Sequence, residues 1–327
     1  VIDDIFIYYV ERGRYIVVVN AANADKDWAW LNAVNEGAVL IDRDNPAMTV
    51  TDKAILRDLK DPACGRDQRV DLALQGRAAL PTLQALSDDP KITEALARLR
   101  RTELVSLALA GMNLVIARTG YTGEDIGYEI FVHPDEAVKL WRLLLEVGAQ
   151  HGVKPCGLAA RDSTRIEAGL PLYGHELNGP LAILPQEAGF PSYLKAHKPF
   201  YIGRAAVMLR AARSTRQLVR FQVNEPGARA LRGGEHGEAI VNRRGGYVGR
   251  VTSCALVEGT QIGLALVERR YAEPGTPLAI YPAAGGKGQA LKPPSDLGEG
   301  DTVTLPVWAT VLARFPQKSG TMDASAD

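Results

Sequence analysis

The chain has 327 residues, with 38 lysines and arginines against 38 aspartates and glutamates. That length suffices for two or three domains, each with its own core. Because the charges balance, the composition excludes the broad attraction to nucleic acid that a basic protein has. The three cysteines lie far apart, without a C-x-x-C pair or a histidine at ligand spacing, so we expect no metal site. We expect a soluble, cytoplasmic protein, since no apolar run approaches the roughly 18 residues of a membrane helix and no signal peptide is recognisable.

The amino-terminal residues predict a hairpin followed by a helix. Two β-rich runs, 5–9 and 15–20, flank a Glu-Arg-Gly-Arg turn, which is typical of a hairpin. A helix should then begin at Asp25, with Trp28 and Leu31 facing inward.

The middle of the chain predicts a compact α+β unit. Further strand and turn are expected over residues 37–56, and two helical pieces broken near Pro90 over residues 79–101. Two strands, 114–118 and 128–132, then flank a connection rich in glycine, which permits backbone angles that other residues avoid. Alternation in the second strand places three residues on one face, Tyr128, Ile130 and Val132, and Glu129 with Phe131 on the other.

Two helices and a β-rich region complete the predicted elements. The first helix opens at Pro134 and ends at Gly152, with four apolar residues at helical spacing: Val138, Trp141, Leu144 and Leu145. The second lies between Gly157 and Gly169 and carries Arg161, Asp162, Arg165 and Glu167. From about residue 217 short β runs separated by glycines favour a small antiparallel barrel or sandwich; the clearest are 248–253, 261–267 and 278–281.

Several segments resemble one known family. The most specific are RTGYTGEDIGYEI (118–130) and PCGLAARDSTRIEAGLPLYGHEL (155–177). The opening residues VIDDIFIYYVERGRYIVVVNAANADKDWAWL, LALQG (72–76), KPFYIGRAAV (198–207) and VGRVTSCALVEGTQIGLALV (248–267) extend the likeness over nearly the whole chain. Together they resemble the aminomethyltransferase family, the T-protein of the glycine cleavage system.

The resemblance implies a fold class and a domain arrangement. The fold is α+β, a folate-binding T-protein-like fold of α+β subdomains followed by a small all-β carboxy-terminal barrel. Residues 1–48 would be the remainder of one folate-binding subdomain, 49–208 a second, 215–316 the barrel and 317–327 a disordered tail. In the family a glycine pair and most of one subdomain precede the position of Val1, so we expect the chain to lack an amino-terminal part of that fold.

The resemblance also implies an enzyme of one-carbon metabolism and glycine catabolism. It would be a tetrahydrofolate-dependent aminomethyltransferase, moving a methylene from a lipoyl-bound aminomethyl group to tetrahydrofolate with release of ammonia. Its partners would be the lipoyl carrier protein (H-protein) and folate, with no nucleic acid, membrane or metal. Two alternatives stay open: a tetrahydrofolate-dependent demethylase of an O-, N- or S-methyl donor, and a non-catalytic folate-binding paralogue.

Two candidate residues lie near the ends of the first hairpin. Adjacent acids such as Asp3 and Asp4 are ordinarily solvated, but the resemblance assigns Asp3 as the catalytic acid and leaves Asp4 structural. A carboxylate suits that role, because it can accept a hydrogen bond or a proton at a reacting nitrogen. Asn20 ends an apolar run, where pattern alone favours a cap or turn residue. The resemblance places it in the folate pocket.

The other candidates lie further along the chain. Tyr121, in the glycine-flanked loop, is either a surface tyrosine or, by the resemblance, a wall of the folate pocket. Glu129 stands mid-strand among apolar neighbours, where an unpaired charge is costly, so it either pairs with Arg161 or Arg165 or accepts hydrogen bonds from a pterin. Arg161 either pairs with a neighbouring acid or, by the resemblance, faces the folate.

Overall fold

The computed structural model describes residues 1–177, 181–234, 236–242, 244–281 and 306–316. The chain divides into two compact units: Ile2–Arg161, and Asp162–Asp327 together with Val1. The predicted tail, 317–327, lies outside the described residues, and the subdomain boundary predicted at residue 48 stays a prediction. Within the described ranges no helix has the length and apolar character needed to cross a membrane.

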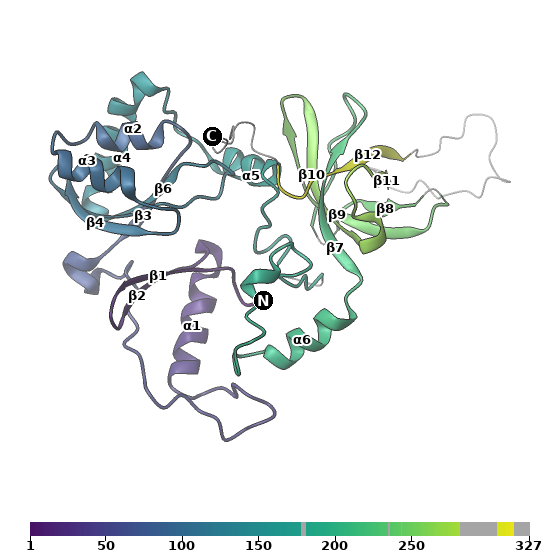
Figure 1. Ribbon diagram of the computed structural model, residues 1–327, viewed down its shortest axis with the longest axis horizontal. Coiled ribbons are helices and arrows are strands. Elements are labelled where there is room, and N and C mark those ends of the chain that lie inside the picture. Colours follow the sequence, from purple (N-terminus) through teal and green to yellow (C-terminus); the bar gives the residue numbers. More distant parts are fainter. Residues whose placement is uncertain (178–180, 235, 243, 282–305, 317–327) are drawn as a thin grey trace, which may run out of the picture. The chain divides into compact units, whose positions relative to one another are not determined.

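The unit Ile2–Arg161 is built on a four-stranded antiparallel sheet in the order β3-β6-β5-β4. Its strands are β3 (Val70–Gln75), β4 (Leu104–Leu109), β5 (Met112–Ala117) and β6 (Gly127–Val132). Three helices cover one face: α2 (Ala79–Gln84), α3 (Pro90–Arg98) and α4 (Pro134–Gly148) (Figure 1). The predicted alternation in β6 is confirmed, because Tyr128, Ile130 and Val132 are buried in the core beneath these helices. Glu129 therefore belongs to the opposite face.

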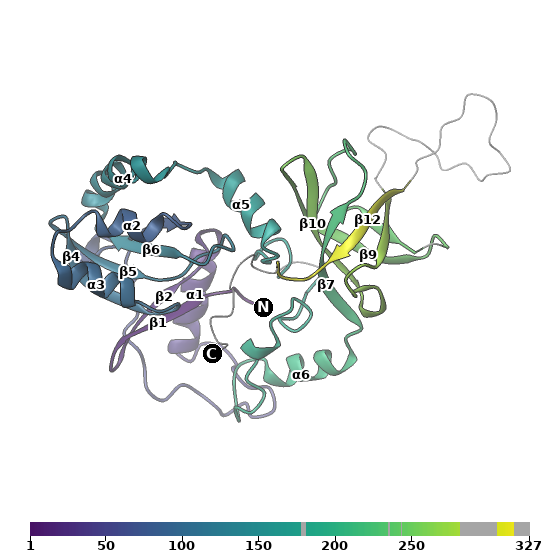
Figure 2. The ribbon, with the colours of Figure 1, turned by 45° about the horizontal axis from the view of Figure 1, so that its top comes forward.

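A hairpin packs against that opposite face, as the second view also shows (Figure 2). It consists of β1 (Phe6–Glu11) and β2 (Arg14–Val18), paired antiparallel as predicted. Tyr8 is its anchor: the side chain is buried against Ala117 of β5 and Phe131 of β6. An aromatic ring buried in this way contributes on the order of 2–3 kcal/mol to folding. The hairpin thus brings β1 to the face of the sheet that carries Glu129.

The first helix, α1 (Ala24–Asn35), has a different buried face from the predicted one. Trp28 and Leu31 are 41% and 37% exposed, whereas Asp27 is only 5% exposed. The prediction that Trp28 and Leu31 face inward is wrong. Consecutive helical residues point about 100° apart, so placing Asp27 inward turns Trp28 away. The spacing of apolar residues predicted the helix correctly but assigned the wrong face of it to the interior.

One further prediction needs correction. Residues 37–56 contain turns but no strand. They are held instead by local polar bonds, such as the amide nitrogen of Asp44 donating to Oδ1 of Asp42 at 3.0 Å, which is the usual aspartate turn. In α4, Val138 and Trp141 are exposed, while Leu140 and Leu144 are buried. The predicted break at Pro90 is confirmed: it opens α3.

The second unit contains a closed barrel in the order β10-β7-β12-β11-β8-β9. Its strands are β7 (Arg216–Val223), β8 (Ala239–Val241), β9 (Tyr247–Val257), β10 (Thr260–Glu268), β11 (Pro277–Tyr281) and β12 (Val307–Leu312). Two longer helices precede it, α5 (Leu158–Glu167), in which the division between the units falls, and α6 (Arg204–Arg213). Short 3-10 helices occupy Ala21–Asn23, Pro62–Asp67, Ala149–His151, Pro191–Tyr193 and Arg269–Tyr271. The predicted carboxy-terminal barrel is confirmed.

A buried ion pair ties α5 to the barrel. Arg165 is 1% exposed and donates to Asp162 at 2.8 Å, to Glu176 at 3.0 Å and to the hydroxyl of Ser253 at 2.8 Å. Glu176 is fully buried and also accepts a hydrogen bond from Ser253. Because every partner is satisfied, the desolvated charges are tolerated. Arg165 is therefore paired with Asp162 and Glu176, not with Glu129 as one alternative had it.

Candidate active site

Asp3 lies in a cradle of amide donors. Its Oδ1 accepts from Nδ2 of Asn20 at 2.9 Å and from Nδ2 of Asn23 at 2.7 Å. Its Oδ2 accepts from the backbone nitrogen of Asn20 at 3.0 Å. Burial alone would raise the pKa of Asp3, but these hydrogen bonds, together with one from Asp27, hold the pKa below its ordinary value. The carboxylate is thus fixed in orientation and favoured in its ionised form.

Asn20 organises this cradle through its side chain. It precedes a 3-10 helix, but its side chain makes no capping bond there. Besides Asp3, the amide donates to Oδ1 of Asp4 at 2.7 Å. Asn20 thus occupies the N-cap position of the 3-10 helix, but its side chain binds Asp3 and Asp4 instead of the helix. Asp4 is exposed and shares its donor with Asp3.

Glu129 stands on the hairpin face of β6 with small neighbours on both sides. Its partner across β3 is Ala73 and its partner across β5 is Ala117. The hydroxyl of Tyr8 donates to its Oε2 at 3.4 Å. Ala73 is exposed, so the β3 side of the carboxyl is open to solvent, whereas Ala117 is buried with Tyr8 and Phe131.

The surroundings of Glu129 leave its carboxyl poorly compensated. Burial raises its pKa to about 7, and the charge of Asp71 adds to this, against the Tyr8 hydrogen bond and the charge of Arg161. Burial and the negative charge of Glu129 also raise the pKa of the Tyr8 hydroxyl. A carboxyl that titrates near neutrality on a sheet face is a candidate functional group.

Tyr121 and Arg161 come together beside this carboxyl. The guanidinium carbon of Arg161 lies over the Tyr121 ring, 4.9 Å from its centroid. This is the distance of a cation–π contact, which orients the guanidinium plane. The positive charge of Arg161 acts to lower the pKa of both Asp4 and Glu129. Arg161 therefore lies close to both parts of the predicted site, the Asp3 cradle and the Glu129 carboxyl. All of the predicted site residues lie within Ile2–Arg161.

Gln75, at the end of β3, holds the loop that carries Tyr121. Its Nε2 donates to the carbonyls of Thr119 and Tyr128 at 3.2 and 3.3 Å. A Cβ on Gly120 or Gly127 would lie 1.8 or 2.2 Å from its Oε1, so a side chain at either position would force Gln75 out of these hydrogen bonds. Sequence reasoning missed Gln75, because nothing local connects it to a loop more than 40 residues away. It also missed Asn23 and Asp27, whose spacing of four on a helix could have been noticed.

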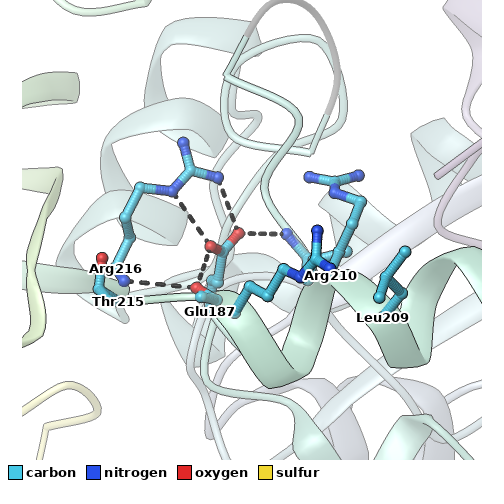
Figure 3. A pocket seen from close by; sticks show the side chains of 8 residues that line it. Glu187, Leu209, Arg210, Thr215 and Arg216 are labelled. Atoms are coloured by element: carbon cyan, nitrogen blue, oxygen red, sulfur yellow. Dashed lines mark hydrogen bonds and ion pairs between the residues drawn. The ribbon is translucent and has the colours of Figure 1, made fainter.

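Other parts of the structure hold no predicted site residue. A hollow of about 250 Å³ in the second unit is lined by charged residues, including Glu187, Arg210 and Arg216 (Figure 3). Glu187 is already bound there by two nitrogens of Arg216, each at 3.1 Å. In the described ranges, no three histidine, cysteine or acidic side chains gather as a metal site would require.

Comparisons with known proteins agree with this arrangement. The family model "GCVT N-terminal domain" matches residues 1–198. The aminomethyltransferase of Alkaliphilus metalliredigens is 36% identical over 282 residues, covering 86% of this chain and 68% of the relative. Those of Caldanaerobacter subterraneus and Halalkalibacterium halodurans are 35% and 34% identical over 284 residues, covering 86% of this chain and 67% and 68% of those proteins.

A solved structure shares the fold. The glycine cleavage system aminomethyltransferase T from Bartonella henselae matches with a TM-score of 0.67 at 22% identity, covering 95% of this chain and 71% of that one. One conclusion accounts for the α+β unit, the closed barrel and the match over residues 1–198. This chain is a member of the aminomethyltransferase family.

Proposed function

We propose that the protein transfers the methylene of a lipoyl-bound aminomethyl group to tetrahydrofolate, as the T-protein of a glycine cleavage system. The carbon–sulfur bond to the lipoyl arm and the carbon–nitrogen bond to the amino group break, and two carbon–nitrogen bonds to the folate form. Ammonia and the dihydrolipoyl carrier protein are the other products. The observation that carries the proposal is the carboxylate of Asp3, fixed by three amide donors in a member of this family.

Asp3 would orient the reacting nitrogen. Three amide donors occupy three of the about four acceptor positions of this carboxylate, so one position remains for a ligand N–H when Asp27 is ionised and does not donate. Because the donors on Asn20 and Asn23 fix the carboxylate before the ligand arrives, little reorganisation is needed at the moment of reaction. Asn20 acts in this proposal by holding Asp3, as well as lining the pocket.

Glu129, Tyr121 and Arg161 would hold the folate. The amino group and adjacent ring N–H of a pterin form two parallel donors, which match the two oxygens of a carboxylate such as Glu129. The exposed Ala73 on β3 would leave space for the ring system on that side of Glu129. Arg161, oriented by Tyr121, offers donors to a carbonyl or carboxylate oxygen. Tetrahydrofolate, when bound, supplies the nitrogen nucleophiles that accept the one-carbon unit.

The proposal is tested with the full-length protein, aminomethyl-loaded lipoyl carrier protein and tetrahydrofolate. Methylenetetrahydrofolate and ammonia should appear in equal amounts, and neither should form without the carrier. Methyltetrahydrofolate formed from an O-, N- or S-methyl donor would instead identify a demethylase. Folate binding without turnover on any of these donors would identify a non-catalytic paralogue and overturn the proposal.

A further inference from the structure

Asp27, on the first turn of α1, is a buried carboxyl without a donor. It is 5% exposed, and neither of its side-chain oxygens receives a hydrogen bond from a donor in the described ranges. The nearest cation is Lys26, whose Nζ lies 3.8 Å from Oδ1, beyond hydrogen-bond distance. Burying a carboxylate in this way is expensive, so the arrangement requires a physical reason.

The neighbour of this carboxyl is Asp3. Asn23 and Asp27 stand four residues apart on one face of the helical segment, and Asn23 donates to Oδ1 of Asp3 at 2.7 Å. The buried carboxyl of Asp27 and that of Asp3 each shift the pKa of the other, as adjacent carboxyls do. Two carboxylates present only acceptors to each other, so they bond only when one of them carries a proton. The contact between Asp3 and Asp27 therefore calls for a bound proton.

We propose that Asp27 shares one proton with Asp3, and that the two carboxyls together form the proton acceptor of the site. Asp27 is then a positioning residue, acting through Asp3. The inference rests on the proposed function for its catalytic consequence, but the shared proton is a property of the ligand-free protein. Carboxyl pairs that share a proton are known to titrate as a unit rather than as separate groups.

The charges around the pair decide which member holds the proton. Asp3 faces three amide donors, from Asn20 and Asn23, which favour its ionised form. Asp27 faces Asp3 and Lys26. Burial raises the pKa of Asp27 to about 6, and the hydrogen bond and negative charge of Asp3 add to this, against the charge of Lys26. The proton therefore belongs to Asp27, whose hydroxyl donates to Asp3.

Sharing changes what Asp3 can do as a base. A carboxylate held by three donors is a weak proton acceptor, because its pKa lies below the ordinary range. Above about pH 6 the pair has released its proton, so a proton that Asp3 takes from the substrate can pass to Asp27 over one hydrogen bond and remain there. General-base catalysis works best when the acceptor titrates near the working pH, and the pair titrates closer to it than Asp3 alone. When the proton is returned to a leaving nitrogen, the pair is restored.

The direct test is a carboxyl-carbon NMR titration of the ligand-free, full-length protein. Burial raises the pKa of three aspartates, Asp4, Asp27 and Asp71, to about 6, so three carboxyl carbons should titrate there, and only the Asp27 transition should vanish in Asp27→Asn. In Asp3→Asn the same transition should move to lower pH, because a like charge is replaced by an amide donor. If Asp27→Asn removes no transition near pH 6, or if Asp3→Asn leaves the Asp27 transition unmoved, the proposal is overturned.

The catalytic consequence has its own readout. The rate constant kcat/KM should fall as pH drops through about 6, where the pair takes up its proton. In Asp27→Asn that limb should shift to lower pH, and the plateau should fall roughly tenfold or more. Folate affinity and Tm should stay close to those of the unsubstituted protein, and Asp25→Asn, an exposed acid on the same turn, is the matched control.

Asp27→Ala extends the test if the Asp27→Asn protein fails to fold. If the fall of kcat/KM at low pH stays at the same pH in either folded Asp27 variant, a shared proton is excluded. If no methylene transfer is detected with the unsubstituted protein, the proposed function fails, and the NMR titration still decides the shared proton.

Discussion

The two units differ in how completely their buried or half-buried charged side chains are paired. In the second unit, Arg165 and Glu176 are both buried, and each charge has a counter-charge and further hydrogen bonds. In the first unit, Glu129 has one tyrosine hydroxyl at 3.4 Å and Asp27 has no donor at all within the described residues. A fully paired arrangement needs no ligand and serves the fold. An incompletely paired one has acceptor capacity left for protons or ligand donors.

The largest effect should come from breaking the fully paired arrangement. Arg165→Met leaves Glu176 buried without its cation, which should lower the free energy of unfolding by about 3–5 kcal/mol. Chemical denaturation followed by circular dichroism measures this. Arg213→Met, at an exposed position of α6, is the control and should change stability by less than about 0.5 kcal/mol. A loss below 1 kcal/mol in Arg165→Met would mean that this buried pair does not stabilise the fold.

The next effect concerns turnover. Asp3→Asn keeps the shape of the cradle but removes the charge, and should slow methylene transfer by on the order of 10²–10⁴. Folate affinity should remain close to that of the unsubstituted protein. Asp4→Asn, the exposed neighbour that shares the Asn20 donor, should have a much smaller effect. Equal rates for Asp3→Asn and the unsubstituted enzyme would remove Asp3 from the mechanism.

A smaller effect is expected on folate binding at Glu129. Glu129→Ala should weaken tetrahydrofolate binding by roughly 1.5–3 kcal/mol, the value of a hydrogen bond to a charged group. Because burial raises the pKa of Glu129 to about 7 and the ionised form accepts the ligand donors, affinity should increase as pH rises from 6 to 8. Isothermal calorimetry at several pH values measures both. Affinity that is independent of pH, or unaffected by Glu129→Ala, would mean that the carboxyl does not contact the ligand.

The smallest effect tests the loop that carries Tyr121. Gly120→Ala should weaken folate binding severalfold, since the new Cβ meets the Gln75 side chain at 1.8 Å. Gln75→Ala removes that obstacle, so the double variant should bind better than Gly120→Ala alone. Such non-additivity is the mark of direct contact. Gly157→Ala, at a glycine without a positive φ and with open space around its Cβ position, is the matched control. Strictly additive changes would show that Gln75 does not hold the loop.

Periodic signals predicted the elements of this protein well, and the burial of particular faces less well. Pro134, Pro90 and the alternation of β6 act locally, so the sequence alone placed α4, the break before α3 and the two faces around Glu129. In α1 the spacing of Trp28 and Leu31 indicated a helix, but the buried position belongs to Asp27. Apolar periodicity cannot reveal a face that is buried against a polar cradle.

The candidate site was predictable only in part, for a similar reason. Asp3, Asn20, Tyr121, Glu129 and Arg161 could be selected from the family resemblance. Their partners Tyr8, Asn23 and Gln75 act through contacts between distant segments, such as the 121 residues between Tyr8 and Glu129. A hydrogen bond over that separation leaves no local pattern. Three-dimensional structure was needed to find which donors hold each carboxylate.

The central claim is that the incompletely paired carboxyls bind donors of a ligand. Proton release on folate binding tests this claim most directly. At pH 7, with a pKa of about 7, Glu129 is about half protonated in the free protein, and binding should drive it to the ionised form. Calorimetry of tetrahydrofolate binding in buffers of different ionisation enthalpy should therefore show release of about half a proton, and Glu129→Gln should abolish it. Equal proton release in both proteins, or none in the unsubstituted protein, would contradict the account.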